Sequence, residues 1–449
     1  MDRIRRLIAP RATYEPIEQP VDADDESNYS VHEDEHQPPF SKYEYAVFFL
    51  LGVSMLWAWN MFLAAAPYFY HRFHSDDWAA AHYQPSILTV STVTNLGSSY
   101  ILAKLQKGAS YPKRVTVSLL INIVVFTLLA FSTILMKGVS VSTYFSFLMV
   151  MVFGASLGTG INQNGVYAYV SGFGREEYTQ AIMGGQGVAG VLPCIVQILS
   201  VISVPSKKGE GQTAPQDLSK SAFAYFITAT AVSSFALLAF FSLVRRRSTT
   251  SPLHAADDQS DSGVSENTAN KTVSLWTLFK KLRFMASAIF LCFTVTMTFP
   301  VFTAEIESVR DAPGRSRLFD PTVFVPLAFF FWNAGDLLGR MLVLVPRLSL
   351  VHRPFALFLF SIARAGFIPL YLLCNIRGRG AVIQSDFFYL FVVQVLFGVS
   401  NGYLGSNCMM GAGQWVSPEE REPAGGFMGL MLVGGLTAGS LMSFFVASA

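Results

Sequence analysis

The chain has 449 residues, of which 52% are hydrophobic and 14% are charged, and its formal net charge is +2. A soluble globular protein carries about 25% charged residues, so this composition excludes most water-soluble classes. The small net charge also argues against a nucleic-acid-binding protein, because the charges lie mostly outside the apolar runs and build no basic face. An integral membrane protein with many spans is the class that remains.

Apolar stretches long enough to cross a bilayer recur along the whole chain. The first six are 44–67, 85–104, 114–136, 143–171, 178–204 and 218–244. After a polar stretch, five more follow at 283–303, 322–345, 353–374, 386–412 and 423–447. We therefore expect an all-α polytopic membrane protein with eleven transmembrane helices, so that the two termini lie on opposite sides of the membrane.

Two polar regions flank and divide these spans. Residues 1–43 are rich in acidic side chains and predict a disordered cytoplasmic tail. Residues 245–282 begin with three arginines and end in a short amphipathic stretch, which predicts a cytoplasmic linker. The linker would separate a six-helix bundle over 44–244 from a five-helix bundle over 283–449.

The distribution of lysine and arginine sets the expected orientation, because basic residues in short loops are retained on the cytoplasmic side. With the N-terminus inside, the inner segments hold about twice as many lysines and arginines as the outer ones. We expect a cytoplasmic N-terminus and an extracellular or lumenal C-terminus.

The loops show no catalytic constellation. The sequence contains no nucleophile triad, glycine-rich nucleotide loop or metalloprotease signature. Its four cysteines lie inside apolar segments without the paired spacing of a zinc or redox motif. The histidines His71, His74 and His82 of the first outer loop fit a solvated loop better than a metal site. We expect neither catalytic residues nor a metal or other cofactor.

Ionisable residues inside a membrane span are costly and are the first place to look for function. In the eighth span, Asn333, Asp336 and Arg340 recur at spacings of three and four, which places them on one helical face. This pattern fits a structural ion pair, and it also fits a binding site for a polar solute. Arg364 in the ninth span fits an interhelical structural role as well as a gating role.

The first span contains Trp57, Trp59 and Asn60 at mid-membrane depth, with Leu56 and Leu63 nearby. An aromatic side chain at this depth fits core packing, and it also offers a stacking surface for a flat ring.

The fourth span carries three consecutive amides, Asn162, Gln163 and Asn164. Amides in hydrocarbon need hydrogen-bond partners, so this cluster indicates a cavity.

These residues resemble the equilibrative nucleoside transporter family across essentially all eleven spans. Trp59 and Asn60 are similar to the family's pair in the first span, although the usual preceding proline is Ala58 here. The other matching motifs are 184–190 (GGQGVAG), 331–340 (FWNAGDLLGR), 364–375 (RAGFIPLYLLCN) and 402–409 (GYLGSNCM).

The resemblance implies a fungal-type member with a major-facilitator-like arrangement of six plus five helices around one central nucleoside site. It implies that Trp59 stacks on the base, that Gln163 contacts the base edge and that Asp336 binds the ribose beside Arg340. Asn60 would support the same pocket. The residues expected to support or gate the site are Leu56, Leu63, Asn333 and Arg364.

The implied function is transport of nucleosides such as adenosine and uridine across a bilayer by alternating access. Proton coupling, nucleobase transport and the choice between the vacuolar and the plasma membrane stay open, and a monomer is expected. The alternative is a major-facilitator transporter of another polar solute such as a sugar. Such a transporter would carry an acidic residue between the second and third spans, where 104–114 has only basic ones.

Overall fold

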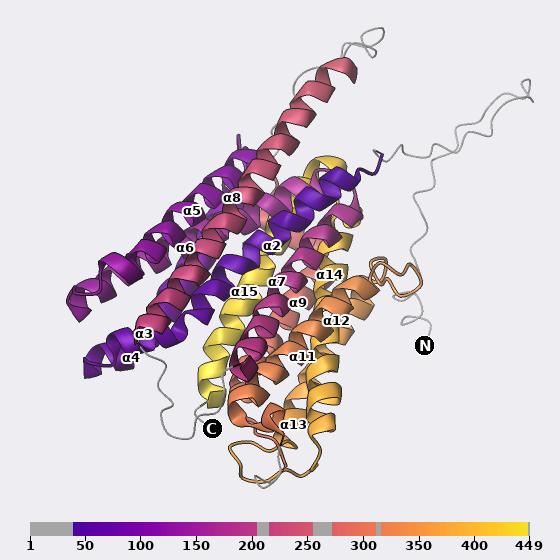
Figure 1. The fold of residues 1–449 in the computed structure, drawn as a ribbon. Helices are drawn as coiled ribbons and strands as arrows, with labels where there is room; N and C mark the ends of the chain where they lie inside the picture. The colour runs from indigo at the N-terminus through magenta and orange to yellow at the C-terminus, as the bar shows by residue number, and fades with distance from the viewer. Residues whose placement is uncertain (1–38, 204–214, 255–271, 311–315, 448–449) are drawn as a thin grey trace, which may run out of the picture.

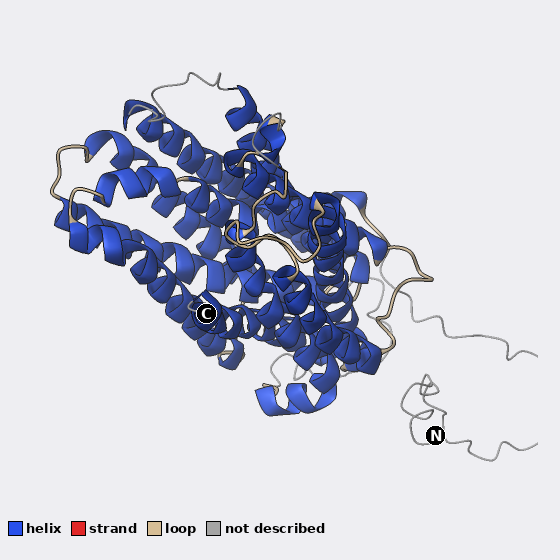
Figure 2. Ribbon diagram, turned by 90° about the horizontal axis from the view of Figure 1, so that it is seen from below, coloured by secondary structure: helices blue, strands red, loops and turns tan. Residues whose placement is uncertain are grey.

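The computed structural model describes residues 39–203, 215–254, 272–310 and 316–447. These residues are helical almost throughout (Figure 2), and their β pairing is one isolated antiparallel bridge between Ile306 and Ile376. The tail predicted to be disordered lies, up to residue 38, outside the described residues. The middle of the predicted linker, 255–271, also lies outside them.

Six helical segments precede the linker and correspond to the first six predicted spans. They are α2 (Lys42–Ala64) with α3 (Ala66–Phe73), α4 (Asp77–Lys104), α5 (Tyr111–Leu135), α6 (Val141–Ser171), α7 (Glu176–Ser203) and α8 (Pro215–His254). Side-chain caps fix several of their starts. Ser41 accepts a hydrogen bond from the N–H of Glu44 before α2, and Asp76 accepts one from the N–H of Ala79 before α4.

Five helical segments follow the linker. They are α9 (Leu275–Thr296) with α10 (Thr298–Glu305), α11 (Pro321–Leu342), α12 (Pro354–Ala363) with α13 (Phe367–Leu372), the π-helical η3 (Phe388–Val395) with α14 (Leu396–Gly411), and α15 (Arg421–Ala447). The described helices therefore confirm the predicted all-α fold with eleven membrane-crossing segments.

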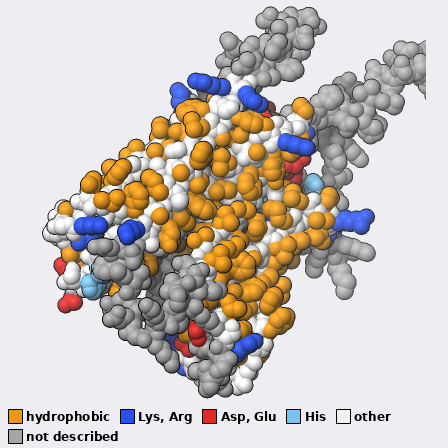
Figure 3. Space-filling model, in the orientation of Figure 1, with side chains coloured by type: hydrophobic (Ala, Val, Ile, Leu, Met, Phe, Trp, Pro, Cys, Tyr) orange, Lys and Arg blue, Asp and Glu red, His pale blue; other side chains and the backbone are white. Residues whose placement is uncertain are grey.

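Length and apolarity suit these segments to a bilayer. Nine of the described segments are long and apolar enough to cross a membrane, and α4 and α11 are not among the nine. At 1.5 Å per residue, even the 22 residues of α11 extend about 33 Å, close to the thickness of a hydrocarbon core. Figure 3 shows apolar side chains covering the visible face of the molecule, with lysine and arginine near its margins.

Three predicted spans are interrupted, and each interruption precedes a proline. α2 gives way to α3 at Ala65, and α9 gives way to α10 at Met297. The third break is the 3-10 turn over 364–366 between α12 and α13. Prolines follow these breaks at positions 67, 300 and 369. Because a proline ring clashes with the carbonyl four residues earlier and donates no hydrogen bond, the helix is disturbed just before it.

Both ends of the predicted linker 245–282 are helical. α8 continues to His254, and α9 already begins at Leu275, where Ser274 accepts a hydrogen bond from the N–H of Trp276. A helix satisfies its backbone hydrogen bonds internally in water as well as in lipid, so a change from apolar to polar sequence does not mark its end. The helices therefore extend beyond the boundaries that apolarity alone predicts.

The two bundles share an apolar core at one end and have separate cores at the other. The shared core joins first-bundle residues such as Phe48 to second-bundle residues such as Phe427. A second core, around Phe126, contains first-bundle residues, and a third, around Phe324, contains second-bundle residues. Figure 1 shows the bundles diverging towards α3 and α13. We call the half where α2 begins the shared half and the half with α3 and α13 the separated half.

Candidate functional site

A buried ion pair on α11 lies at the centre of the site. Arg340 Nε is 2.7 Å from Asp336 Oδ2, and the two residues are 5% and 4% exposed. Glycines on either side of the carboxylate allow η3 and α14 to pack directly on this helix. A Cβ at Gly335 would overlap the Val395 carbonyl, and one at Gly339 would overlap the Val399 carbonyl. The pair predicted from the four-residue spacing is therefore present and enclosed.

Arg340 also connects the second bundle to the first. Its Nη1 donates to the Met183 carbonyl at 2.8 Å and to Gln186 Oε1 at 3.2 Å, both on α7. Gln186 Nε2 in turn donates to the hydroxyl of Tyr167 on α6 at 3.0 Å. One guanidinium thus bonds to a carboxylate of its own helix and to two acceptors of the opposite bundle.

The other oxygen of Asp336 is held by α14. Asn401 Nδ2 donates to Asp336 Oδ1 at 2.7 Å, and Asn401 Oδ1 accepts from Thr296 Oγ1 at 2.6 Å and from Arg364 Nη2 at 3.4 Å. Arg364 is fully buried, and its Nε donates to Ser400 Oγ at 2.9 Å. Arg340 therefore bonds to Asp336 directly, whereas Arg364 is linked to it through the amide of Asn401 and bonds within the second bundle.

The predicted polar residues Asn60 and Asn333 contact adjacent positions of α7. Asn60 Nδ2 donates to the Ala189 carbonyl at 2.8 Å, which joins α2 to α7. A Cβ at the next residue, Gly190, would lie 2.5 Å from Asn333 Oδ1. Asn333 Nδ2 also lies 3.6 Å from Cys194 Sγ. These contacts place Asn60 and Asn333 at the same level along α7, about one turn beyond Gln186.

The other predicted residues of α2 lie at the start of the separated half. The Trp59 ring is half-buried and stacks on Phe62, with centroids 5.7 Å apart. Leu56, Asn60 and Leu63 follow one another at spacings of four and three and so share a face of the helix. Along this face the exposure rises from half-buried Leu56 to Leu63, which is 53% exposed.

Gln163 lies on α6 one turn before Tyr167, so the two side chains share a face of that helix. Its Oε1 is buried and has no hydrogen-bond partner within the described ranges. Asn162 Oδ1 is likewise buried without a partner in these ranges, whereas Asn164 accepts a hydrogen bond from Arg114 Nη1 towards the end of the shared half. Of the three amides, Gln163 is thus the one that shares a face with Tyr167 of the buried network.

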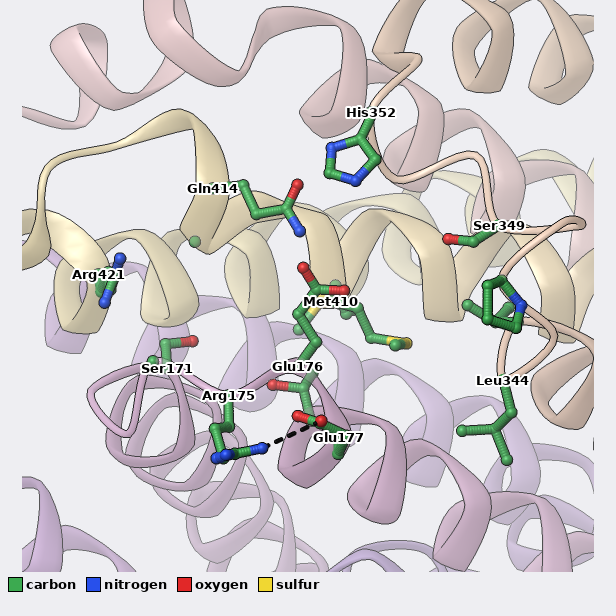
Figure 4. Close-up of a pocket in the computed structure, with 16 residues that line it drawn as sticks. Ser171, Arg175, Glu176, Glu177, Leu344, Ser349, His352, Met410, Gln414 and Arg421 are labelled. Atoms are coloured by element: carbon green, nitrogen blue, oxygen red, sulfur yellow. Dashed lines mark hydrogen bonds and ion pairs between the residues drawn. The ribbon is translucent and has the colours of Figure 1, made fainter. Parts of the chain in front are cut away.

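A cavity of about 630 Å³ opens at the end of the shared half (Figure 4). Both bundles line it, with Arg175 and Glu177 from the first and His352 and Gln414 from the second. Arg175 Nη1 lies 3.2 Å from Glu177 Oε1. None of the predicted site residues is among the lining residues, so this cavity is the mouth of the shared half and is distinct from the network around Asp336.

Comparison with known proteins identifies the family. The model of a family described as nucleoside transporter matches residues 148–448. The nucleoside transporter FUN26 of Saccharomyces cerevisiae is 30% identical, over 89% of this chain and 83% of its own length. The chain belongs to the nucleoside transporter family. Equilibrative nucleoside transporter 1 of Homo sapiens is 28% identical, over 91% of this chain and 98% of its own length.

Solved structures support the same architecture for this nucleoside transporter family member. The major facilitator superfamily transporter FucP of E. coli, crystallised in the outward conformation, gives a TM-score of 0.56 at 13% identity. The match covers 90% of this chain and 92% of FucP. At this identity the likeness shows the fold alone, and it confirms the predicted major-facilitator-like arrangement. The family match confirms that the chain is a transporter and not an enzyme, and it disfavours the sugar-transporter alternative.

Two partners of the ion pair escaped the sequence analysis, Gln186 and Asn401. Gln186 lies inside the glycine-rich motif 184–190, which carries the family resemblance but by itself predicts no role for the glutamine. Asn401 lies beside the motif 402–409. An amide within an apolar helix was the available signal in both cases, and it is the signal that selected Gln163.

Proposed function

We propose that the protein carries nucleosides across a membrane by alternating access, with Asp336 and Arg340 at the centre of the substrate site. The observation that supports this proposal is the position of the ion pair. Asp336 is held by two helices of the second bundle, while Arg340 bonds to α7 of the first. A substrate bound beside the pair would contact both of the units that must move relative to one another.

The chemistry of the site suits a nucleoside. Each oxygen of the Asp336 carboxylate accepts one hydrogen bond in the structure and has capacity for another, so ribose hydroxyls can donate without breaking the pair. The half-buried ring of Trp59 offers a face on which a base can stack. Gln163 supplies a buried acceptor for the base edge. Asn60 and Asn333 fix α7 between α2 and α11.

The arrangement of the cores supports a transport cycle. In the described state the bundles share a core in one half and are separate in the other. Transport would require the shared core to part, so that the cavity of Figure 4 extends towards Asp336 while the separated half closes. With the N-terminus in the cytoplasm, the shared half faces the cytoplasm. The separated half then faces the outside or the lumen, as does the C-terminus.

The remaining assignments belong to the same proposal. We place the protein in the vacuolar or the plasma membrane as a monomer, and we give Leu56, Leu63 and Arg364 supporting or gating roles. The predicted tail 1–43 is shorter than expected, because α2 already begins at Lys42. The substrates of the protein are nucleosides such as adenosine and uridine, moved by facilitated diffusion or with protons, and the site binds neither a metal nor a cofactor.

The direct test is uptake of labelled adenosine and uridine into liposomes that contain the purified protein, with and without an inward proton gradient. We expect saturable uptake by the wild-type protein, and loss of most of it in Asp336→Asn, because the amide cannot accept as the carboxylate does. Near-normal uptake by folded Asp336→Asn protein would overturn the assignment of the site.

A thermal-shift assay in detergent separates the two solute classes. A ligand that binds only the folded state stabilises it, by about 2.7 kcal/mol when the ligand concentration is a hundred times its dissociation constant. Such a ligand therefore raises the melting temperature. Adenosine and uridine should raise the melting temperature, whereas fucose and glucose should leave it unchanged. Stabilisation by the sugars alone would overturn the proposed substrate class.

A further inference from the structure

Five buried side-chain oxygens on α4 and α6 have no hydrogen-bond partner among the residues that the structure describes. They are Asn95 Oδ1 and Ser99 Oγ on α4, and Ser156 Oγ, Asn162 Oδ1 and Gln163 Oε1 on α6. The great majority of buried polar atoms in proteins are hydrogen-bonded, so a group of orphaned oxygens needs an explanation. Within a membrane the need for an explanation is greater, because hydrocarbon offers no donors that could bond to these oxygens.

Three of them belong to residues that lie beside one glycine, Gly160, or within about one turn of it. A Cβ at Gly160 would lie 3.2 Å from Asn95 Oδ1 and would overlap Ser98 Oγ, so the glycine lets α4 approach α6 closely. Ser156 lies four residues before Gly160, and Gln163 lies three residues after it, which places all three positions on one face of α6. We call Asn95, Ser156 and Gln163 the acceptor patch.

The acceptor patch continues the face of α6 that reaches the ion-pair network. Gln163 lies one turn before Tyr167, and the Tyr167 hydroxyl accepts from Gln186, which in turn accepts from Arg340. A substrate whose ribose lies at Asp336 would therefore extend its base along this face, towards Asn95. The patch lies on the first bundle, across from the carboxylate that belongs to the second.

We propose that Asn95, together with Gln163, recognises an exocyclic amino group on the base and makes the protein prefer amino-bearing nucleosides to their oxo counterparts. This inference rests on the proposed transport of nucleosides and names the selectivity of the same site. An amino group has two N–H donors, which match the two amide oxygens. An oxo group at the same position would place an acceptor against acceptors and leave the buried oxygens unpaired.

A matched control residue lies on α5, against the opposite side of α6. Asn122 of α5 also has a buried Oδ1 without a partner in the described part of the chain. Its Oδ1 lies 3.0 Å from a Cβ built at Gly158. Gly158 and Gly160 are two residues apart, so they point to opposite faces of α6. Asn122 therefore has the chemistry of Asn95 without facing the acceptor patch.

The experiment compares two pairs of nucleosides that differ at one exocyclic group, adenosine with inosine and cytidine with uridine. Each is used to compete with labelled adenosine uptake in liposomes containing the wild-type protein, Asn95→Leu or Asn122→Leu. One or two hydrogen bonds to the amino group predict that adenosine and cytidine inhibit the wild-type protein at concentrations about three- to tenfold lower than inosine and uridine do. Asn95→Leu should bring the oxo-to-amino ratio of inhibitory concentrations close to one in both pairs, and Asn122→Leu should leave both ratios as in wild type.

Two further substitutions protect the test against misfolding. Asn95→Asp keeps an acceptor in place and should keep the preference for the amino group. Gln163→Leu should weaken that preference as Asn95→Leu does. Uptake that makes no distinction between amino and oxo members in wild type, or ratios that persist in Asn95→Leu, would overturn the recognition by the acceptor patch while nucleoside transport stands. Folded wild-type protein that takes up no nucleoside would overturn both.

Discussion

The shared half and the separated half of the molecule are built from the same helices but are packed by different means. In the shared half, glycines bring the bundles into backbone contact. A Cβ at Gly425 of α15 would overlap the Tyr167 carbonyl of α6, and one at Gly187 of α7 would meet Leu337 of α11 at 2.9 Å. In the separated half, bulky residues such as Phe126 and Phe324 fill the core of a single bundle.

This difference indicates which contacts must be reversible. The glycine contacts at Gly187 and Gly425, which we call the seam, bury little apolar area themselves. The rings of the shared core beside them, such as Phe48 and Phe427, must part as well. The cores within each bundle bury large rings and have no reason to open. The ion-pair network lies where the two kinds of packing meet, because Arg340 of the second bundle donates to the Met183 carbonyl of the first. We therefore expect the bundles to move as units about the seam, with the proposed substrate site where the seam ends.

The strongest way to break this arrangement is Asp336→Ala. It leaves Arg340 and Arg364 buried without the Asp336 carboxylate, and removal of one partner of a buried ion pair costs about 3–5 kcal/mol. We expect a lower melting temperature in detergent and uptake at background. The matched control is Glu305→Gln, which removes a carboxylate from the more exposed pair with Arg377 and should change stability by less than about 1 kcal/mol. Equal effects of the two substitutions would contradict the central role of Asp336.

A substitution in the seam should act on the shared half alone. The methyl group of Gly425→Ala would overlap the Tyr167 carbonyl and force α15 away from α6. We expect faster uptake of an impermeant maleimide at a cysteine introduced at Thr179, a buried residue that lines the cavity of Figure 4, together with slower transport. Gly97→Ala, where a Cβ would meet nothing within 4 Å, is the control. Unchanged labelling in Gly425→Ala would show that this seam does not seal the shared half.

Arg340→Lys is expected to have a smaller effect. Lysine keeps the charge but lacks the planar fork, so it cannot hold Asp336, the Met183 carbonyl and Gln186 together. Loss of one or two such hydrogen bonds should raise the KM for adenosine about tenfold, at little cost to melting temperature. An unchanged KM would mean that the bonds from Arg340 to α7 do not shape the site.

The smallest effect is expected at the surface. Lys281 Nζ lies 2.6 Å from Glu420 Oε2, and both residues belong to the second bundle. Because the lysine is solvent-exposed, Lys281→Gln should change the free energy of unfolding by less than about 1 kcal/mol and leave the uptake rate unchanged. A large change in transport would show that this pair takes part in the movement of the bundles.

The sequence predicted what depends on spacing within one helix. The four-residue interval between Asp336 and Arg340 predicted their pairing, and the apolar runs predicted the eleven segments. The partners Gln186 and Asn401 are distant from Asp336 in sequence, and the packing of glycines against carbonyls determines which amide arrives there. The breaks at Ala65 and Met297 were missed because the apolar pattern continues through them, although the prolines that follow were visible. The substrate roles of Trp59 and Gln163 stay predictions.

The two buried guanidinium groups near Asp336, those of Arg340 and Arg364, have a consequence for the leakage of ions. Arginine keeps its proton, so the buried centre of the protein has one positive charge in excess over Asp336. A sodium ion about 8 Å away would be repelled by about 2 kcal/mol at an effective dielectric constant of about 20, which lowers its occupancy roughly thirtyfold. An uncharged nucleoside meets no such barrier. The site can thus be opened to either side in turn while the membrane keeps its voltage.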